Sequence, residues 1–342
     1  MKAIVYTEYG SPSDVLQLKE VEKPTPKDDE VLIKVRASSI NAAELHLIRA
    51  DPFLVRLSTG LLKPTKTIPG ADVAGRVEAV GRNVTQFKPG DEVFGDLSGC
   101  GWGAFAEYVC ANENALLLKS TNMTFEQAAA VPVAGVTALQ GLRDKGQLKS
   151  GQKVLINGAS GGVGMFAVQI ARSFGAEVTG VCSTKKMDMV RSLGADHVID
   201  YTHEDVTQSG QHYDLILDAA AYRSFSVYKR VLSPRGIYVF AGGSTSGLFR
   251  TMLQGPLMSK REGQTFVTLA AGPNLKDLGF MKELLETSKV TPFIDRCYPL
   301  SEAAAALRYV EERHVQGKVV ITVAPNGKAW QSAAPDQYAA QP

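Results

Sequence analysis

A glycine-rich segment has the residue types and spacing to bind a dinucleotide. Residues 159–164 form an A-x-G-x-x-G pattern after a strand-like run ending at Asn157 and before an amphipathic, helix-like run. Small residues allow a tight turn, the middle glycine lets backbone N–H groups approach a pyrophosphate, and the last glycine allows close helix packing. The helix N-terminus adds partial positive charge. A glycine turn without function is the alternative. The predicted dinucleotide-binding residues are Ala159, Ser160, Gly161, Gly162, Val163 and Gly164.

The end of the next expected strand bears on which dinucleotide is bound. Proteins that bind NAD usually carry Asp or Glu there, which holds the ribose 2′-hydroxyl. Residues 181–186 of this chain read Val-Cys-Ser-Thr-Lys-Lys, without an acid. A carboxylate would repel a 2′-phosphate, whereas hydroxyl and ammonium groups would bind it. The segment predicts NADPH rather than NADH, and a solvated basic helix start is the alternative.

Two textures of sequence would position these residues. Short runs rich in Val and aromatic residues occupy the first 120 residues and predict strands: KAIVY, EVLIKVRA, DVAGRVEAV, DEVFG and AFAEYVCA. In EVLIKVRA, Val31, Ile33 and Val35 alternate with Leu32, Lys34 and Arg36, which predicts a half-buried strand. Thr124 and Gln127 form a capping-box pattern at the start of an Ala-rich helix. Apolar strands and helices then alternate, which predicts a parallel sheet covered on both faces.

The predicted fold is therefore α/β, with a β domain and a doubly wound parallel-sheet domain. We expect helices over about 163–174 and 185–193, around FSVYKRVL, and near 275–288 and 301–312. KVVITV predicts a last strand, and the residues after Val323 resemble a loose tail. We place the β domain in residues 1–125 and 272–342 and the dinucleotide-binding domain in residues 126–271.

Composition narrows the class of protein. A length of 342 residues fits two domains, and a net charge of +2 favours neither nucleic acid nor an anionic membrane as a partner. Four scattered cysteines without a C-x-x-C pattern argue against disulfides and a clustered zinc site. The start of the chain has no signal-peptide pattern, and no apolar stretch reaches membrane-spanning length. These observations predict a cytoplasmic protein.

The chain resembles the zinc-independent quinone oxidoreductases, the zeta-crystallin-like branch of the medium-chain dehydrogenase/reductase superfamily. The segments that carry this resemblance span about residues 1–323 and include VRASSINAAELH, IPGADVAGRVEAVG, AAAVPVAGVTALQGL, NGASGGVG and GKVVITV. The resemblance implies a GroES-like β domain with an inserted Rossmann domain, a substrate cleft between the two, and a homodimer.

The resemblance also argues against a metal. Zinc alcohol dehydrogenases have a Cys in the segment that matches SSINAAELH and a His-Glu pair in the one that matches PGADVAG. This chain has Asn41 and Ala71-Asp72 at those positions. Catalytic zinc needs about three protein ligands, which Asp72 alone does not supply, and His46 has no partners. Without such a Lewis acid, alcohol oxidation is disfavoured, whereas hydride transfer to an electron-poor acceptor remains feasible.

The resemblance implies further contacts to the cofactor. Asn41 is expected near the nicotinamide and the acceptor, where it is also the candidate catalytic residue. Plainer alternatives exist for several positions: a helix Thr for Thr137, a strand-end Tyr for Tyr201, core residues at 266–269 and a surface lysine for Lys318. Beyond the loop, the expected contacts are Asn41, Thr137, Ser183, Thr184, Lys186, Tyr201, Gly242, Gly243, Phe266, Val267, Leu269, Gly317 and Lys318.

The implied activity is NADPH-dependent reduction of a quinone or an α,β-unsaturated carbonyl. The alternatives are an enoyl-thioester or other alkene or carbonyl reductase, and a non-catalytic NADPH-binding protein. His46, Tyr6, the Asn41 amide and solvent are the candidate proton donors. Residues 50–70 are expected to border the acceptor site and to influence acceptor size.

Overall fold

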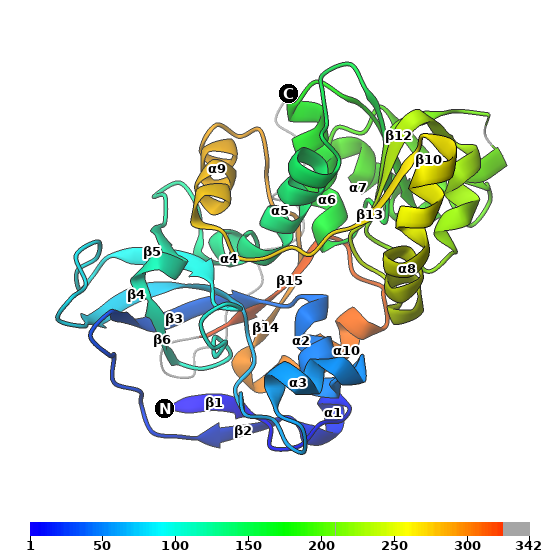
Figure 1. Ribbon diagram of the computed structural model, residues 1–342. Helices are drawn as coiled ribbons and strands as arrows, with labels where there is room; N and C mark the ends of the chain where they lie inside the picture. The colour runs from blue at the N-terminus through cyan, green and yellow to red at the C-terminus, as the bar shows by residue number, and fades with distance from the viewer. Residues whose placement is uncertain (209, 324–342) are drawn as a thin grey trace.

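The computed structural model describes residues 1–208 and 210–323, which form two large sheets side by side (Figure 1). The predicted loose tail lies outside the described residues. The chain builds most of the first sheet, crosses to the second after β7, and returns to the first with β14 and β15. The first sheet therefore draws on both ends of the chain. The domain bounds near residues 125 and 272 stay a prediction.

The first sheet has seven strands, in the order β14-β15-β3-β4-β5-β7 with β6 also paired to β3. All pairs are antiparallel except β14 with β15. Val320 of β15 lies opposite Ser39 of β3, which joins the C-terminal return to the N-terminal part. The strands are β3 (Glu30–Ser39), β4 (Asp72–Val80), β5 (Glu92–Asp96), β6 (Tyr108–Asn112), β7 (Leu116–Leu118), β14 (Ile294–Pro299) and β15 (Lys318–Thr322).

Two expectations for the N-terminal part need correction. KAIVY supplies β1 (Lys2–Val5), which pairs only with β2 (Gln17–Glu20) in a separate two-stranded sheet. In β3, Leu32 is buried together with Val31 and Ile33, so the strand is not half-buried along its whole length. The second face is partly covered, because the Arg36 guanidinium lies over the ring of Phe125 in α4 (Phe125–Ala129).

The second sheet has six parallel strands in the order β10-β9-β8-β11-β12-β13. From β8 at the centre the chain first builds one side and then crosses to the other, which is the doubly wound order. The predicted parallel sheet is thus confirmed. Its strands are β8 (Lys153–Asn157), β9 (Glu177–Cys182), β10 (His197–Asp200), β11 (Tyr213–Asp218), β12 (Leu232–Phe240) and β13 (Thr265–Thr268).

Most of the expected helices are present. The predicted capping box is confirmed, since the Thr124 side chain accepts from the Gln127 backbone N–H and the Gln127 side chain accepts from that of Thr124. FSVYKRVL forms a 3₁₀ segment, Phe225–Arg230, rather than an α-helix. The helices other than α4 are α1 (Pro12–Val15), α2 (Ala42–Arg49), α3 (Arg56–Thr59), α5 (Pro132–Leu139), α6 (Gly162–Ser173), α7 (Met187–Ser192), α8 (Thr245–Glu262), α9 (Leu275–Glu286) and α10 (Ala303–Glu311).

Helix α8 has no counterpart in the sequence analysis. Gly255 and Pro256 lie inside it, and these residues usually interrupt a helix. The Ser244 side chain caps the helix by accepting from the backbone N–H of Gly247, and Gly255 packs against β13, where an added Cβ would lie 2.8 Å from the Phe266 carbonyl oxygen. Tertiary packing therefore overrides the local signals. No helix in the described ranges is long and apolar enough to cross a membrane.

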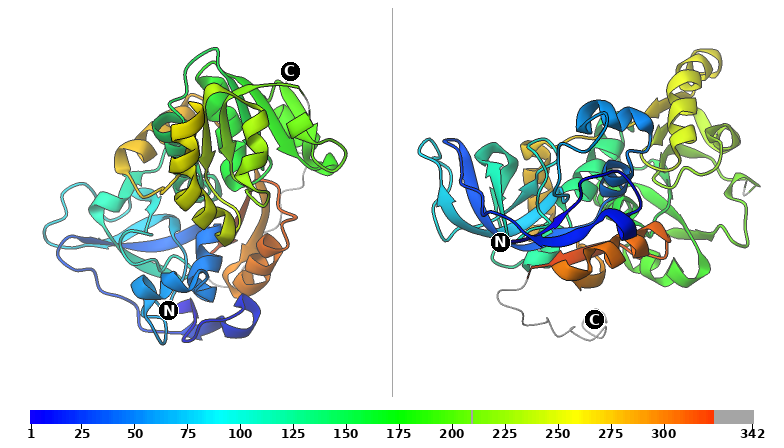
Figure 2. Two further views of the ribbon diagram at one scale, coloured as in Figure 1. Left: turned by 45° about the vertical axis from the view of Figure 1, so that its right-hand side comes forward. Right: turned by 90° about the horizontal axis from the view of Figure 1, so that it is seen from below.

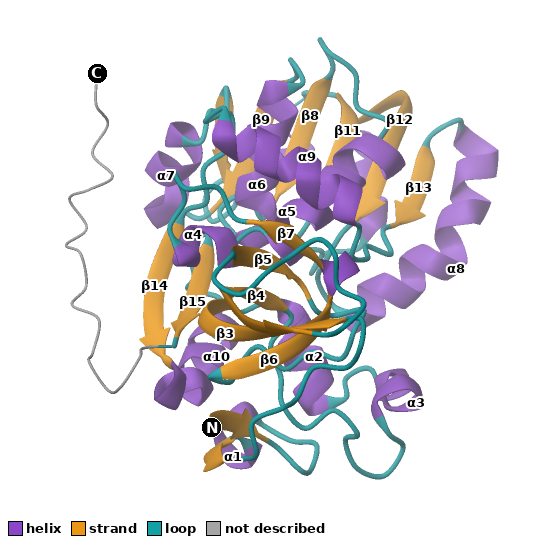
Figure 3. Ribbon diagram, turned by 90° about the vertical axis from the view of Figure 1, so that its left-hand side faces the viewer, coloured by secondary structure: helices purple, strands orange, loops and turns teal. Residues whose placement is uncertain are grey.

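The two sheets meet where the C-terminal return begins. Figure 2 shows the orange C-terminal strands against the blue N-terminal part and close to the green parallel-sheet part. Helices α5 and α6 and the start of β15 lie at this junction (Figures 1 and 3). The junction therefore brings the 159–164 loop close to residues from both ends of the chain.

Candidate functional site

The glycine-rich loop connects β8 to α6 and depends on two glycines for its shape. Gly158 has a φ of 78°, a left-handed conformation that side chains disfavour. At Gly164, an added Cβ would lie 2.0 Å from the Gly158 carbonyl oxygen. The last glycine of the pattern is thus required for close packing of α6 on the loop. Gly158 lies outside the predicted set, although it directly precedes the pattern.

The start of β15 docks on this loop. The Gly317 backbone N–H donates to the Ser160 carbonyl oxygen at 2.8 Å. Gly317 has a φ of 75°, and an added Cβ there would lie 2.2 Å from the Phe293 carbonyl oxygen, so only glycine fits. An added Cβ on Gly162 would lie 3.1 Å from Cδ of Lys318. The aliphatic part of Lys318 therefore passes directly beside the N-terminus of α6.

The Lys318 ammonium ends in a buried polar cluster of the first sheet. Lys318 Nζ donates to Asn41 Oδ1 at 2.5 Å and lies 3.4 Å from Asp72 Oδ2. Asn41 Nδ2 donates to the same Asp72 oxygen at 2.8 Å. Lys318 is only 2% exposed and Asp72 is fully buried, so Lys318 is no surface lysine. A buried ammonium needs such a carboxylate partner.

Asp72 connects this cluster to the second sheet's helices. Its Oδ1 accepts from the Val133 backbone N–H at 2.9 Å, in the first turn of α5, and its Oδ2 also accepts from the Ser39 hydroxyl. Thr137 lies one turn after Val133 on α5, and positions four apart share a helix face. The cluster thus brings Asn41 and Lys318 together and places the backbone of Thr137 one helical turn from it.

Glu44 is a buried carboxylic acid that the sequence analysis missed. Its Oε2 accepts from the Asn41 backbone N–H at 2.7 Å and its Oε1 from that of Ala71 at 3.0 Å. Burial, and then the charge of Asp72, raises the pKa of Glu44 to about 7. The Asn41-x-x-Glu44 spacing is a capping-box signal that could have revealed it.

The far end of the loop region carries an unexpected acid. Asp200 ends β10, opposite Cys182 of β9, and the Thr184 hydroxyl donates to it. That bond, with further donation from Thr202, lowers the pKa of Asp200. A carboxylate therefore lies beside Thr184, although residues 181–186 contain none.

The other residues predicted at this end lie as follows. Lys186 Nζ donates to the carbonyl oxygens of Val315, at 2.8 Å, and Arg313, at 3.3 Å, and burial lowers its pKa. Ser183 directly precedes Thr184 at the end of β9, and Tyr201 is 54% exposed. Ser183, Thr184 and Tyr201 are therefore neighbours, whereas Lys186 is turned toward residues 313–315.

The ends of β12 and β13 hold the remaining predicted contacts. Gly243 approaches the Ala221 backbone so closely that an added Cβ would lie 2.6 Å from it, and Gly242 directly precedes it. Phe266 is buried, with its ring 5.4 Å from that of Phe225, which favours the core alternative for Phe266. Val267 and Leu269 are partly buried and pack against the larger core on the other face.

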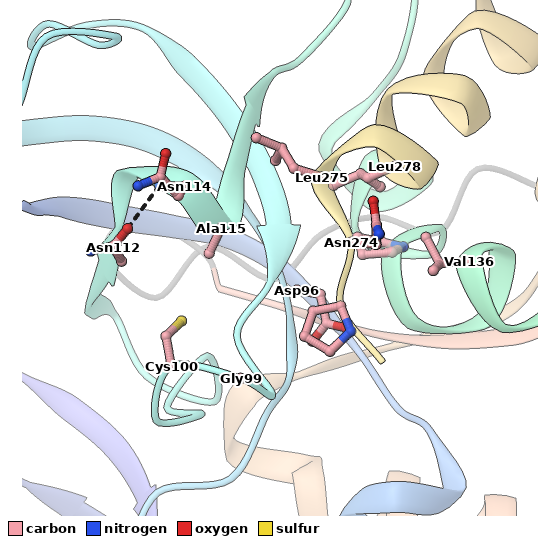
Figure 4. Close-up of a pocket in the computed structure, with 12 residues that line it drawn as sticks. Asp96, Gly99, Cys100, Asn112, Asn114, Ala115, Val136, Asn274, Leu275 and Leu278 are labelled. Atoms are coloured by element: carbon pink, nitrogen blue, oxygen red, sulfur yellow. Dashed lines mark hydrogen bonds between the residues drawn. The ribbon is translucent and has the colours of Figure 1, made fainter. Parts of the chain in front are cut away.

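A cavity of about 230 Å³ lies between the first sheet and helices α5 and α9. Figure 4 shows Asp96, Asn112 and Asn114 on one side and Val136 of α5 and Asn274 beside α9 on the other. Burial, and then the charge of Asp72, raises the pKa of Asp96 to about 6. None of the predicted cofactor contacts lines this cavity.

Two of the candidate proton donors differ in availability. Tyr6 is buried, its hydroxyl has no hydrogen-bond partner among the described residues, and burial raises its pKa. His46 Nδ1 lies 2.6 Å from the Asp51 carbonyl oxygen. If Nδ1 carries the hydrogen of that contact, Nε2 is left to accept or, once protonated, to donate. In the described ranges no group of three or more His, Cys, Asp or Glu side chains is arranged to hold a metal ion.

The sequence matches two known family descriptions. Residues 27–121 match the family Alcohol dehydrogenase GroES-like domain, and residues 193–321 match Zinc-binding dehydrogenase. The Chloroplast envelope quinone oxidoreductase homolog of Arabidopsis thaliana is 36% identical over 332 residues, covering 94% of this chain and 98% of that protein. The chloroplastic NADPH-dependent alkenal/one oxidoreductase of the same organism is 36% identical over 337 residues, covering 95% and 80%.

Solved structures show the same fold. The quinone oxidoreductase from Coxiella burnetii has a TM-score of 0.84 at 30% identity and covers 95% of this chain and 99% of its own. A structure described as an NAD-dependent alcohol dehydrogenase has a TM-score of 0.82 at 28% identity, with 95% and 100% covered.

Proposed function

The chain belongs to the medium-chain dehydrogenase/reductase superfamily, and from that premise we propose that it is an NADPH-dependent reductase of quinones or α,β-unsaturated carbonyls. The named quinone oxidoreductase and alkenal/one oxidoreductase relatives support the reductase activity. The observation that carries the proposal is the position of Lys318, which joins the glycine-rich loop of one sheet to Asn41 of the other.

The residues of the loop fit a dinucleotide. Gly158, Gly161 and Gly164 leave the backbone bare at the N-terminus of α6, where a pyrophosphate would meet N–H groups and partial positive charge. The remaining N–H capacity of Lys318 is directed to the same region, since an ammonium has three donors and its bonds to Asn41 and Asp72 use two. We infer that Ser160 to Gly164, Gly317 and Lys318 hold the pyrophosphate.

The preference for NADPH rests on Ser183, Lys186 and Tyr201. Lys186 would have to leave the carbonyl oxygens of residues 313 and 315 to reach a 2′-phosphate, and Asp200 would have to be satisfied by Thr184 and Thr202. The threonine bonds neutralise part of the acid's capacity to hold a ribose hydroxyl. We therefore keep NADPH as the proposed cofactor.

The residues at the first sheet do not fit a catalytic zinc. Asn41 and Ala71 supply neither thiolate nor imidazole, and the third position at α5 is the backbone of Val133. Asp72 already accepts from Ser39, Asn41 and Val133 and pairs with the Lys318 ammonium. We propose a zinc-independent reaction.

A bound reduced nicotinamide supplies a hydride. Asn41 is held by Lys318 and Asp72, so its orientation is fixed and its second Nδ2 hydrogen can donate to an acceptor oxygen. A conjugated acceptor spreads the arriving charge onto that oxygen, and a proton from His46 or solvent completes the two-electron reduction. Burial of Lys318 and Asp72 excludes water from one side of the site.

The experiment is oxidation of NADPH by the purified protein with a panel of quinones, enones and enoyl thioesters, with NADH in parallel. Turnover of NADPH with a quinone or enone supports the proposal. Preference for an enoyl thioester would favour the alternative reductase. NADPH binding without turnover on any acceptor would favour a binding protein. A cytoplasmic location and a homodimer stay predictions.

A further inference from the structure

Exposed apolar side chains are concentrated in two segments that are far apart in the sequence. Nine of the thirteen large apolar residues that are exposed in the described part of the chain lie in residues 53–62 and 249–257. Soluble proteins rarely expose such groups together without a function. We call these residues the apolar face: Phe53, Leu54, Leu57, Leu61, Leu62, Phe249, Met252, Leu253 and Leu257.

Both segments project from the same side of the molecule. Figure 3 shows α3 and α8 at the right, and the view from below in Figure 2 shows both at the top. Phe249, Met252, Leu253 and Leu257 follow the spacing of one helix stripe. The opposite side of α8 packs on the protein, because Thr251 is buried and Gly255 contacts the Phe266 backbone. The stripe is therefore turned to solvent.

The charge of these segments is one-sided. Residues 52–71 and 245–259 contain no Asp or Glu, although the whole chain carries 35 acidic residues. They contain four basic residues, Arg56, Lys63, Lys66 and Arg250. Leu62 is 90% exposed beside the exposed Lys63, and Leu253 is 73% exposed three positions after Arg250.

This combination selects one kind of partner. A two-fold contact with a second copy would place the same basic surface against itself, with no acid to pair with it. An anionic lipid surface complements both properties, because leucines enter the interfacial region while ammonium and guanidinium groups meet lipid phosphates. We propose that the apolar face docks the protein peripherally on anionic membranes. This binding is separate from the proposed reductase activity and needs no turnover.

The test is co-sedimentation of the full-length purified protein with vesicles of phosphatidylcholine, with and without one quarter phosphatidylglycerol. We expect binding to the anionic vesicles that weakens at high salt, because surface charges are screened. In the variant Leu62→Glu/Leu253→Glu, the vesicle partition coefficient should fall about 100-fold, since removing each leucine from the interface costs about tenfold. Both leucines are exposed, so thermal unfolding should match that of the wild type.

The matched control is Leu118→Glu, which changes an exposed leucine of β7, away from α3 and α8 (Figure 3). It should bind vesicles as the wild type does. No binding of folded wild-type protein to anionic vesicles at low salt would overturn the proposal. Equal loss in the control would also overturn it, as would a double variant that loses only self-association in sedimentation velocity. All these readouts are independent of whether any acceptor is reduced.

Discussion

The ammonium of Lys318 donates to the side-chain oxygen of Asn41, although the two residues are 277 positions apart. The contact depends on β15, which returns to pair with β3 and so carries Lys318 from the loop of the parallel sheet into the antiparallel sheet. Asn41, Asp72 and Lys318 thus form one charged, hydrogen-bonded group at the junction.

Lys318→Met should destabilise the fold. The substitution leaves the buried Asp72 carboxylate without its cation, and breaking a buried pair costs about 3–5 kcal/mol. Urea unfolding measures this loss. Lys318→Arg, which keeps the charge, should lose less, and adding Asp72→Asn to Lys318→Met should recover part of the loss. Wild-type stability in Lys318→Met would show that the pair is not buried as described.

Gly164→Ala and Gly161→Ala should separate folding from binding. At Gly164 the new Cβ would lie 2.0 Å from the Gly158 carbonyl oxygen, so the melting temperature should fall. At Gly161 the nearest atom is 3.4 Å away, so the fold should tolerate the methyl group. NADPH affinity should nevertheless fall, by about tenfold or more, because Gly161 is where a pyrophosphate approaches the backbone. Calorimetry and NADPH titration of both variants check the pair.

Lys186→Glu should weaken NADPH binding more than NADH binding, since the new carboxylate would repel a 2′-phosphate. Lys149→Glu makes the same change of charge at an exposed position before β8 and should affect both cofactors little. Fluorescence titration with each cofactor measures the ratio. Equal losses of the two affinities in Lys186→Glu would contradict the phosphate assignment.

Some of this arrangement could be predicted from the sequence, and some could not. The loop, its strand and its helix follow from local patterns, and Asn41 and Lys318 follow from the family resemblance. Glu44 had a readable signal in its spacing from Asn41. Asp200 did not, because it meets Thr184 only once β10 is known to lie beside β9. Helix α8 was hidden by Gly255 and Pro256, whose unfavourable local effect is overcome by packing on β13.

Metal analysis should find no stoichiometric zinc in the purified protein, and a chelator should leave its activity unchanged. The reason is the donor set at the first sheet, where an amide, an alanine and a backbone N–H stand in place of thiolate and imidazole ligands. One zinc per chain, lost together with activity on chelation, would contradict the proposed reaction.

The stability of the protein should fall as the pH rises through the titration of Glu44. Burial and Asp72 raise its pKa from 4.5 to about 7, so the folded state binds this proton more tightly than the unfolded chain. The stabilisation is fully present below the unfolded value and is lost as the pH approaches 7, and it amounts to about 3 kcal/mol. Urea unfolding across this range measures the slope.

Glu44→Gln isolates the contribution of this one acid. Glutamine is uncharged and should flatten the pH dependence, although it also lowers stability at every pH, because its single oxygen can accept from only one of the two N–H groups of Asn41 and Ala71. Asp96 and Asp218, whose pKa values burial raises to about 6, remain in both proteins and titrate in the same direction. The difference between the two slopes therefore belongs to Glu44. Identical slopes would show that Glu44 is ionised throughout, held by its two backbone donors and the nearby Lys318.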